Sequence, residues 1–547
     1  MYKILTLEKL RKFKPDATLR DLVIQMKRLD DEKMRELNEK HSILSMKINC
    51  VKGNFGEKIQ EIISKKEKVS VIADYDVDGV MSAAIWKEFL DYHEIPSEIL
   101  IPNRFKDGYG FGESMLQKVI ESGCKWIITC DNGIKSNETI EKANSLGMTV
   151  IVTDHHQPGE VLPNAEVIAN PHCGEQTLKT NEICGAMVSW VLVKDYIENP
   201  VLVKSLLELA AVATLADVMP LIKENRTLIK WFITRVKRGE NTHLGLDQLI
   251  RTSGIGRKAF NEETIAFTIA PLINAAGRLK DAGIAYEALI GKNKEQNHKQ
   301  IQTLLELNDK RKQYSNYSVQ LAMEQIKDPR DCYCVFLEGC PEGIIGIVAG
   351  KLTEKTGKPC FVFSKMHNSD KVKGSGRSPI NYNLIEGANE VFGKHPELTS
   401  GFGGHAGAMG LSLNSVECIK EFEKLMIENY SQSETTDTLV EYVIKYPEGY
   451  TMEEVWNTLQ EFAPYGEGFK PISFYVKEKI SNLDYIKDTH SFFDAKLNGE
   501  IQEFCFFHNI IPEKDNHMEK HIVFSINRDC KDKEEIVKFQ PYVNDIF

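Results

Sequence analysis

The sequence lacks the features that mark membrane, secreted and zinc-binding proteins. Its 547 residues are 42% hydrophobic, yet no apolar run approaches the roughly 18 residues of a membrane span. The N-terminal residues MYKILTLEKLRKF contain no apolar core followed by a small-residue cleavage site, so we expect no secretory signal. The chain has 12 cysteines but no Cys-x-x-Cys pair. Free thiols of a cytoplasmic protein are therefore the simplest interpretation.

The chain also lacks the positive charge that is common in nucleic-acid-binding proteins. Its formal net charge is −11, but binding depends on local patches rather than on the total. Residues 1–50 carry 12 Lys and Arg against 8 Asp and Glu. This local excess either contacts a phosphate backbone or forms an ordinary solvated helical face. No internal repeat and no Ser/His/Asp arrangement of a covalent catalyst is present.

What the sequence does have is a series of acidic clusters, each placed after a short apolar run. They are Asp74, Asp76 and Asp78 after residues 71–73, Asp131 after residues 126–130, and Asp154-His155-His156 after residues 149–153. If the first run continues as a strand, its three aspartates share one face, because side chains i and i+2 do so. Carboxylates this close repel one another, and a bound divalent cation is the usual remedy. For one such cluster alone, a solvated acidic turn is the alternative.

The runs between these clusters predict a doubly wound α/β sheet. Short β-branched runs bounded by polar turns are typical of buried parallel strands. Helical patterns lie between them, at about residues 82–91 and 137–146. Strands and helices therefore alternate, and the carboxyl ends of parallel strands line the ligand crevice of such folds. All three acidic clusters fall at those ends.

A fourth acidic position follows a different kind of element. Residues 206–215 form an apolar, Ala-rich helical run, and Pro220 ends the helix shortly after Asp217. By itself, Asp217 is an ordinary helix-terminal acid. Together with the other clusters, it becomes a candidate metal ligand.

These motifs resemble those of a known superfamily. The segments DYDVDG (74–79), DNG (131–133), DHH (154–156) and ADVMPL (216–221) occur in the order found in DHH phosphoesterases. The segments GSGRS (374–378) and GGHA (403–406) resemble the associated DHHA1 domain. The combination is most similar to the RecJ family of single-stranded-DNA-specific exonucleases and covers almost the whole chain. This resemblance implies a metal-dependent enzyme that hydrolyses single-stranded DNA in the 5′→3′ direction to mononucleotides, in DNA repair and recombination.

The resemblance and the residue patterns together divide the chain into five parts. We expect an amphipathic helical segment (1–50), an α/β DHH domain with a parallel sheet (51–290), a connecting helix (291–330), a second α/β domain of the DHHA1 type (331–430) and an OB-like β barrel (436–547). Residues 432–440 are polar and form the expected linker. The stretch 292–328, which contains neither Gly nor Pro, predicts either one long strut between two domains or a packed helix pair. Residues 466–471, GEGFKP, resemble the family's Gly-x-Gly-Asn-Pro turn, with Phe469-Lys470 in place of Asn.

The acidic clusters predict a site for two divalent cations. The expected ligands are Asp76, Asp78, Asp131, His155 and Asp217. Oxygen-rich ligands with one or two histidines suit Mn²⁺ or Mg²⁺ better than a thiolate-binding metal. Asp131 is the candidate bridge between the two ions. Asp74 is either a further ligand or a base, and His156 either orients a ligand, meets the phosphate or packs behind the site.

A second set of residues is expected to hold the substrate. By resemblance, Arg278, Ser375 and Arg377 match a pocket for the 5′-terminal phosphate, and Asn274 also matches the family pattern. Gly374 and Gly376 allow backbone amides to approach an anion, and Arg377 adds a bidentate donor. RecJ-like chains usually carry an arginine where this chain has Leu272, so we expect one basic contact of the family to be missing here.

Two further residues each have an alternative that needs no substrate. His405 either contacts a phosphate or is a buried histidine that bonds its own loop. Arg104 either contacts the strand or is a surface arginine beside Asp107.

Three rival functions remain open at this point. The first is an oligoribonucleotide or cyclic-dinucleotide phosphodiesterase, which usually lacks the C-terminal barrel. The second is a non-catalytic RecJ-like scaffold, which typically loses metal ligands. The third is an inorganic pyrophosphatase, whose C-terminal domain differs. A single-strand-binding protein or a helicase as partner, action as a monomer, and the absence of membrane attachment are further expectations from the resemblance.

Overall fold

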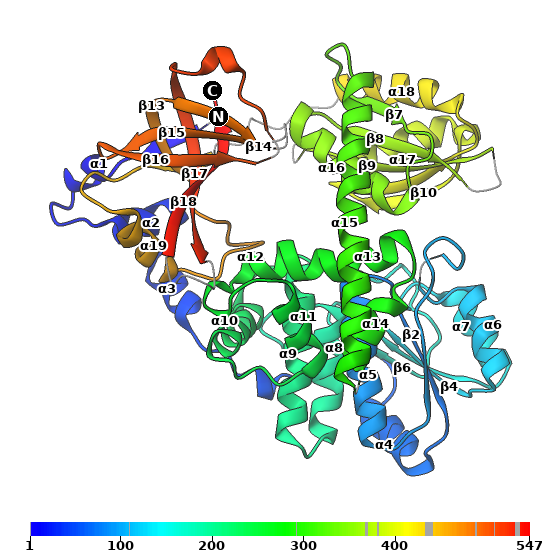
Figure 1. Ribbon diagram of the computed structural model, residues 1–547. Coiled ribbons are helices and arrows are strands. Elements are labelled where there is room, and N and C mark those ends of the chain that lie inside the picture. Colours follow the sequence, from blue (N-terminus) through cyan, green and yellow to red (C-terminus); the bar gives the residue numbers. More distant parts are fainter. Residues whose placement is uncertain are drawn as a thin grey trace.

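A computed structural model places the chain in three bodies, two in a column and one beside them (Figure 1). It describes residues 2–108, 110–291, 293–366, 370–379, 382–432, 441–486, 490–507, 509–530 and 537–547. Most of the expected linker, residues 433–440, lies outside the described residues. The first α/β domain lies at the bottom of Figure 1, the second α/β domain above it, and the C-terminal sheet unit at the upper left.

The first α/β domain is built on a five-stranded sheet whose strands are all parallel, in the order β3-β2-β4-β5-β6. The strands are β2 (Val69–Ala73), β3 (Ser97–Leu100), β4 (Trp126–Cys130), β5 (Thr149–Thr153) and β6 (Val167–Ala169). Both β2 and β4 are buried along their whole length. The apolar runs are therefore strands covered on both faces, as the sequence predicts.

Helices cover both faces of this sheet, which confirms the doubly wound arrangement. One core contains α4 (Phe55–Lys65), α5 (Val77–Tyr92) and α8 (Gly185–Val193). The other contains α6 (Glu113–Ser122) and α7 (Asn137–Ser145). The carboxyl ends of the strands are consequently left free to carry a site.

A helical layer extends the first domain beyond its sheet. It consists of α9 (Pro200–Ala216), α10 (Lys223–Arg238), α11 (Leu244–Thr252), α12 (Glu262–Thr264), α13 (Ala270–Leu279) and α14 (Gly283–Ile290). Asp217 is the C-cap residue of α9, as expected from the proline two residues beyond Val218. Leu272 is 1% exposed and lies in the main hydrophobic core. In this chain position 272 therefore contributes packing and no positive charge.

One continuous helix, α15 (Lys294–Gln325), joins the two α/β domains. Its 32 residues correspond to about 48 Å at 1.5 Å per residue. It packs against α13 and α14 in the first domain and against α16 in the second. The stretch is thus the strut between domains and not a helix pair (Figure 1).

The second α/β domain has a mixed sheet in the order β10-β11-β9-β8-β7. Its strands are β7 (Tyr333–Phe336), β8 (Cys360–Lys365), β9 (Val372–Arg377), β10 (Thr399–His405) and β11 (Ala408–Leu413). Its helices are α16 (Glu342–Thr356), α17 (Leu384–Lys394) and α18 (Cys418–Gln432). The strand β9 carries the GSGR segment in the middle of the sheet, between β8 and β11.

The C-terminal sheet unit contains eight strands in the order β1-β12-β13-β17-β18-β16-β15-β14. They are β1 (Tyr2–Leu5), β12 (Glu441–Lys445), β13 (Phe474–Lys479), β14 (Ser481–Ile486), β15 (His490–Leu497), β16 (Glu500–Phe506), β17 (Glu519–Cys530) and β18 (Val537–Ile546), with helix α19 (Met452–Gln460). Among the described residues no ladder joins β14 to β1. The unit is a sheet of the expected location, and its closure into an OB-like barrel stays a prediction.

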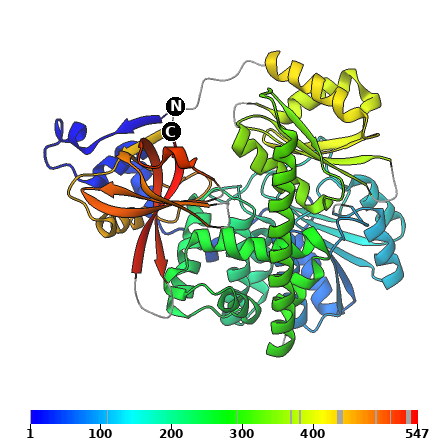
Figure 2. The same ribbon diagram turned by 45° about the horizontal axis from the view of Figure 1, so that its top comes forward.

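The prediction that residues 1–50 are purely helical is wrong at their start. Tyr2–Leu5 is a strand, β1, and it pairs in parallel with β12 of the C-terminal unit. Edge pairing with a distant strand overrides the local helical pattern here. The helices α1 (Leu7–Arg11), α2 (Leu19–Lys27) and α3 (Asp31–Asn38) follow, and their apolar residues pack into the core of that unit. The two chain ends consequently lie together (Figure 2).

Two expectations about broad class can be compared with the structure. Among the residues it describes, none of the helices is both long enough and apolar enough to cross a bilayer. The 11 cysteines whose side chains are described all carry free thiols, which confirms that prediction for these residues.

Candidate metal centre and anion pocket

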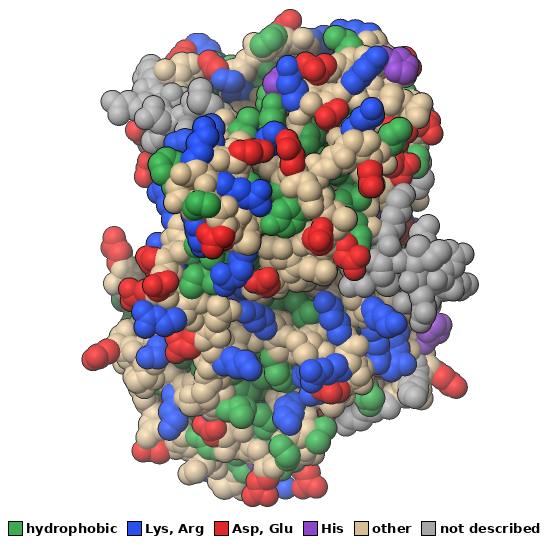
Figure 3. Space-filling model, turned by 90° about the vertical axis from the view of Figure 1, so that its left-hand side faces the viewer, with side chains coloured by type: hydrophobic (Ala, Val, Ile, Leu, Met, Phe, Trp, Pro, Cys, Tyr) green, Lys and Arg blue, Asp and Glu red, His purple; other side chains and the backbone are tan. Residues whose placement is uncertain are grey.

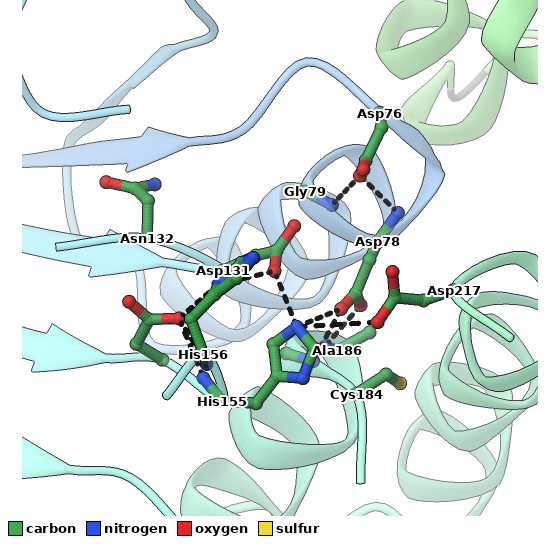
Figure 4. Close-up of polar contacts among 12 residues, drawn as sticks. Asp76, Asp78, Gly79, Asp131, Asn132, His155, His156, Cys184, Ala186 and Asp217 are labelled. Carbon is green, nitrogen blue, oxygen red and sulfur yellow. Dashed lines mark hydrogen bonds and ion pairs between the residues drawn. The ribbon is translucent and has the colours of Figure 1, made fainter. Parts of the chain in front are cut away.

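The acidic triplet of residues 74–78 does not continue a strand, so that part of the sequence interpretation is wrong. Strand β2 ends at Ala73. The Asp76 carboxylate accepts hydrogen bonds from the amides of Asp78 (3.0 Å) and Gly79 (3.2 Å), and this cap starts helix α5. Asp76 and Asp78 still lie at the carboxyl edge of the sheet, because the chain turns there from strand to helix (Figure 4). Asp74 stays with them, since its ligand atom lies within 4.8 Å of those of Asp76 and Asp131.

Asp78 is held in place by the first turn of another helix. Its Oδ2 accepts from the Gly185 amide (2.6 Å) and its Oδ1 from the Ala186 amide (2.7 Å), at the N-terminus of α8. Gly185 has no side chain at a point where one does not fit, since a Cβ there would lie 2.8 Å from the Cβ of Asp131. Helix α8 thus fixes Asp78 and approaches Asp131 closely at the same position.

His155 lies at the centre of the cluster (Figure 4). Its Nε2 is 3.1 Å from Asp131 Oδ1, 3.5 Å from Asp78 Oδ2 and 3.5 Å from Asp217 Oδ2. These residues come from the ends of β4 and β5, the first turn of α5 and the C-terminus of α9. The structure therefore brings together in space the four segments that the sequence analysis selected.

Three groups of side chains have the spacing of metal ligands. In each group the candidate ligand atoms all lie within 4.8 Å of one another: Asp78, His155 and Asp217; Asp74, Asp76 and Asp131; and Asp131, His155 and His156. Asp131 belongs to two of these groups, which is the position expected of a bridging carboxylate.

Several polar atoms of this cluster are buried without a hydrogen-bond partner among the described residues. They are Asp74 Oδ1, Asp131 Oδ1 and His155 Nε2. Such atoms are costly unless something satisfies them. Oxygen and imidazole nitrogen atoms in this arrangement fit a divalent cation of the Mn²⁺ or Mg²⁺ kind.

The electrostatics of the cluster point the same way. Burial and the charges of neighbouring aspartates raise the pKa values of Asp74 and Asp131 well above the usual range of an aspartate. Burial and the charge of Asp78 raise the pKa of Asp217 to about 8. Burial lowers the pKa of His155, which favours the neutral imidazole that metals require. Without added positive charge these acids resist ionisation, and cations would relieve that resistance.

Asp154 is a functional residue that the sequence analysis did not select. It is 1% exposed, and its carboxylate accepts from the amides of Ile134 (2.9 Å), His155 (2.7 Å) and His156 (3.1 Å). Its Oδ1 also lies 2.8 Å from His156 Nδ1. Burial by itself would lower the pKa of His156, but the hydrogen bond and charge of Asp154 raise it to about 9. Asp154 thus holds the loop and favours the protonated form of His156.

Asn132 has a comparable holding role next to Asp131. Its side-chain amide donates to the carbonyls of Ile72 (3.0 Å) and Cys130 (2.9 Å), which ties the ends of β2 and β4 together. Asp131 itself has a positive φ of 59°, a conformation that side chains rarely adopt. The DNG segment therefore supplies one candidate ligand and one residue that fixes its loop.

A cavity of about 650 Å³ lies between the two α/β domains. The candidate substrate residues Arg104, Arg278, Ser375 and Arg377 all line it, together with Lys106 and Lys373. Tyr75 lines it too, and this residue stands between Asp74 and Asp76 in sequence. The cavity is thus a cationic pocket that adjoins the acidic cluster.

The arginines of the cavity are held by few and mostly neutral partners. Arg278 donates to the Gly343 carbonyl (3.1 Å), and Arg377 donates to Ser375 Oγ (3.0 Å) and the Gly376 carbonyl (2.8 Å). The Arg104 guanidinium lies 4.3 Å from the centre of the Tyr75 ring. Asp107 instead pairs with Lys118, so the interpretation of Arg104 as a surface arginine beside Asp107 is wrong. These neutral partners leave the positive charges available to an anion.

Arg311 on α15 is a cation of this region that no sequence pattern singles out. Its Nε is buried without a hydrogen-bond partner among the described residues. Burial, Arg104 and Arg311 together lower the pKa of Arg278 to about 10. Crowded like charges of this kind favour the binding of an anion.

The remaining candidate residues, His405 and Asn274, lie outside the lining of the cavity. His405 is exposed at the end of β10 and accepts a hydrogen bond from the Gly407 amide (3.3 Å). It bonds its own loop, but the prediction of a buried histidine is wrong because the β10 edge faces solvent. Asn274 is half-buried on α13. Neither residue is among those that line the cavity.

Family models match two parts of the chain. The DHH family N-terminal domain matches residues 68–214, and the DHHA1 domain matches residues 331–432. The first match contains Asp74, Asp131 and His155, and the second contains Ser375 and Arg377.

Curated relatives and solved structures agree with these matches. The chain is 33% identical over 362 residues to the single-stranded-DNA-specific exonuclease RecJ of Bacillus subtilis. The aligned residues make up 66% of this chain and 45% of that protein. It is 30% identical over 381 residues to the exonuclease of the same name from Dickeya dadantii, which is 65% of each chain. The chain thus spans less than two thirds of the length of these relatives. The crystal structure of RecJ from Thermus thermophilus in complex with Mn²⁺ has the same fold, with a TM-score of 0.76, 22% identity and coverage of 96% of this chain and 75% of that one.

Proposed function

Because the chain is a RecJ-like member of the DHH superfamily, we propose that it is a metal-dependent exonuclease specific for single-stranded DNA. It hydrolyses phosphodiester bonds from the 5′ end and releases mononucleotides. The activity serves DNA repair and recombination in the cytoplasm. Association with a single-strand-binding protein or a helicase, and action as a monomer, follow from the family resemblance alone.

One observation carries this proposal. Acids and a histidine from four separated segments lie within metal-ligand spacing of one another. Three of their ligand atoms, on Asp74, Asp131 and His155, are buried without a hydrogen-bond partner among the described residues. Asp78, His155 and Asp217 would hold one cation, and Asp74, Asp76 and Asp131 a second, with Asp131 adjacent to both. When bound, two divalent cations activate water and stabilise the charge of the leaving oxygen in phosphodiester hydrolysis.

His156 supplies a hydrogen-bond donor beside these carboxylates. Its side chain is 42% exposed, and Asp154 raises its pKa to about 9, with burial opposing that shift. It therefore serves as a hydrogen-bond donor to the phosphate that enters the site. This role uses the part of the cluster that is open to solvent.

The cationic cavity sets the direction of attack. Arg278, Ser375 and Arg377 bind the 5′-terminal phosphate, and Arg104 contacts the strand. Arg104 stacks on Tyr75, a neighbour of Asp74 and Asp76, so an anchored end lies next to the acidic cluster. An anchored terminal phosphate selects which bond is cut, and this gives 5′→3′ polarity.

The cavity lies between two domains that are joined by α15. Single strands are selected because a duplex is too wide to enter this gap. The C-terminal sheet unit provides a further surface for the strand. On the side of the molecule where this unit lies, Lys and Arg side chains form a row across the lower half of the view and mix with Asp and Glu side chains above (Figure 3). Locally positive regions thus exist although the net charge is −11.

A direct experiment is cleavage of end-labelled, 5′-phosphorylated single-stranded DNA with Mn²⁺ or Mg²⁺. The 5′-labelled strand should release labelled mononucleotide at once, whereas the 3′-labelled strand should shorten before it releases label. Blunt duplex DNA should be cut far more slowly. Digestion of the duplex at the same rate as the single strand, or release from the 3′ end first, would overturn the proposal.

A further inference from the structure

The loop that follows Asp217 has an unusual conformation. It links α9 to α10, and both Val218 (φ 55°) and Lys223 (φ 44°) have positive φ values. Such conformations cost free energy and persist only where surrounding contacts enforce them. On the side of the first domain, Asn225 donates a hydrogen bond to the Pro220 carbonyl (3.0 Å). This bond is one of the contacts that enforce the loop.

The C-terminal sheet unit supplies another contact through the turn of residues 466–470. The Leu221 amide donates to the Glu467 carbonyl across 2.8 Å. A Cβ on Gly466 would lie 2.9 Å from a methyl carbon of Leu221, and one on Gly468 would lie 3.5 Å from the Cβ of Pro220. The turn therefore packs directly on the loop that begins with Asp217.

Arg226 fastens this turn to the first domain. The residue is 3% exposed, and its guanidinium donates to the carbonyls of Phe462, Ala463 (3.0 Å) and Pro464 (2.7 Å). It also lies 5.1 Å from the centre of the Phe469 ring. These partners are backbone carbonyls and a ring rather than a carboxylate, so this buried charge serves to fix a chain segment.

Phe469 also holds the turn in place through its ring contacts. Its ring stacks on that of Tyr465 at 5.6 Å between centroids and 11° between planes. Lys27 of α2 lies 5.3 Å from the ring centre on the side of the N-terminal segment. Phe469 stands where the resembling family turn has Asn, so this chain has its own means of holding the turn.

We propose that the turn of residues 466–470, fastened by Arg226 and Phe469, positions Asp217 and thereby sets the cation affinity of the group Asp78, His155 and Asp217. The C-terminal sheet unit is then a support of the metal centre as well as a surface for DNA. The inference rests on the proposed function only in requiring that this group binds a cation. Residues that orient metal ligands typically change metal affinity by about 10- to 100-fold when they are altered.

The test is a titration of the whole metal-free protein with Mn²⁺, followed by electron paramagnetic resonance in the absence of DNA. The variant Phe469→Leu should bind one of two Mn²⁺ ions about 10-fold more weakly and leave the other unchanged. The matched control is Phe13→Leu, since Phe13 is 89% exposed and belongs to the same unit. Equal affinities in Phe469→Leu, Phe13→Leu and the unaltered protein would overturn the inference.

A second pair of variants guards against simple misfolding. Gly466→Ala pushes on Leu221, whereas Gly393→Ala in α17 has nothing within 4 Å of the added Cβ. Gly466→Ala should weaken the binding of the same Mn²⁺ ion. Its midpoint of thermal unfolding should be close to that of Gly393→Ala. If the unaltered protein binds no Mn²⁺, the proposed function fails. If it binds two ions and Gly466→Ala matches Gly393→Ala, only the positioning inference fails.

Discussion

The Nε2 atom of His155 lies 3.1 Å from Asp131 Oδ1, and both atoms are buried without a hydrogen-bond partner among the described residues. The two residues follow neighbouring parallel strands, in which Cys130 pairs with Thr153. The register of β4 and β5 therefore sets this distance. A cation site at this edge is thus a consequence of how the sheet is assembled.

The close approach of α8 to Asp131 predicts that Gly185→Ala weakens metal binding. The added Cβ would lie 2.8 Å from the Asp131 Cβ, a distance that forces Asp131 or α8 to move. We expect at least an approximately 10-fold loss of Mn²⁺ affinity by calorimetric titration. Gly393→Ala, where the Cβ meets no atom within 4 Å, serves as control. Unchanged Mn²⁺ affinity in a folded Gly185→Ala protein would show that α8 does not position Asp131.

Arg311 is expected to contribute to recognition of the 5′-phosphate. Its charge acts on Arg278, and its Nε is free of hydrogen bonds among the described residues. Arg311→Gln should raise KM for 5′-phosphorylated strands about 10-fold, as expected for loss of a charge-assisted hydrogen bond, and should affect 5′-hydroxyl strands much less.

The neighbouring residue on α15 gives the control for this measurement. Lys312 is exposed, so Lys312→Gln removes one positive charge without changing the cavity. Its KM should stay near that of the unaltered protein at moderate salt. Equal effects of Arg311→Gln and Lys312→Gln would mean that only general attraction to DNA is lost.

Asp154→Asn should change the titration of His156. Removal of the Asp154 charge takes away the main cause that raises the pKa of His156 to about 9 against the effect of burial. The imidazole should then lose its proton nearer to about pH 6.5, which nuclear magnetic resonance of the metal-free protein can follow. We expect kcat to fall about 10- to 100-fold. Asp309→Asn, at an exposed position of α15, is the control, and an unshifted His156 titration would contradict the assigned role of Asp154.

Removal of metal should make stability depend on pH in a defined direction. Burial and Asp78 raise the pKa of Asp217 to about 8, above its value of about 4 in the unfolded chain. The metal-free folded state therefore binds more protons than the unfolded state, and its stability should fall as pH rises from about 4 to about 8.

Thermal unfolding with EDTA or with Mg²⁺ checks this expectation. The rise in Tm on adding Mg²⁺ should be larger near about pH 8.5 than near about pH 6.5, because metal binding competes with protons at the acids. A gain in Tm that is independent of pH, or larger at the lower pH, would contradict the raised pKa of Asp217.

Much of the fold could be predicted because its signals are local. The runs 126–130 and 149–153 coincide with β4 and β5, since β-branched residues buried on both faces leave a continuous apolar pattern. The end of α9 at Asp217 follows from the nearby proline. The long charged stretch without Gly or Pro is one helix, α15.

Other features depend on contacts that no local pattern records. Strand β1 forms because it pairs with β12, which lies at the other end of the sequence. Arg311 lies in a charge-dense helix and looks solvated until α15 is placed beside the second domain. Asp154 precedes the candidate ligand His155 and resembles a ligand itself, but the amides around it make it an acceptor that holds the loop. The sequence signal for this role is an aspartate at the end of a strand, because aspartate side chains in turns often accept hydrogen bonds from the next backbone amides.

The central proposal is that Asp131, which belongs to two of the three candidate ligand groups, is needed for cation binding and cleavage. The most direct measurement is cleavage of 5′-labelled single-stranded DNA by Asp131→Asn, with DNA binding and Mn²⁺ binding recorded on the same preparation. We predict DNA binding close to that of the unaltered protein, weakened Mn²⁺ binding and a rate at least about a hundredfold lower. Robust cleavage with Mn²⁺ binding intact would contradict it.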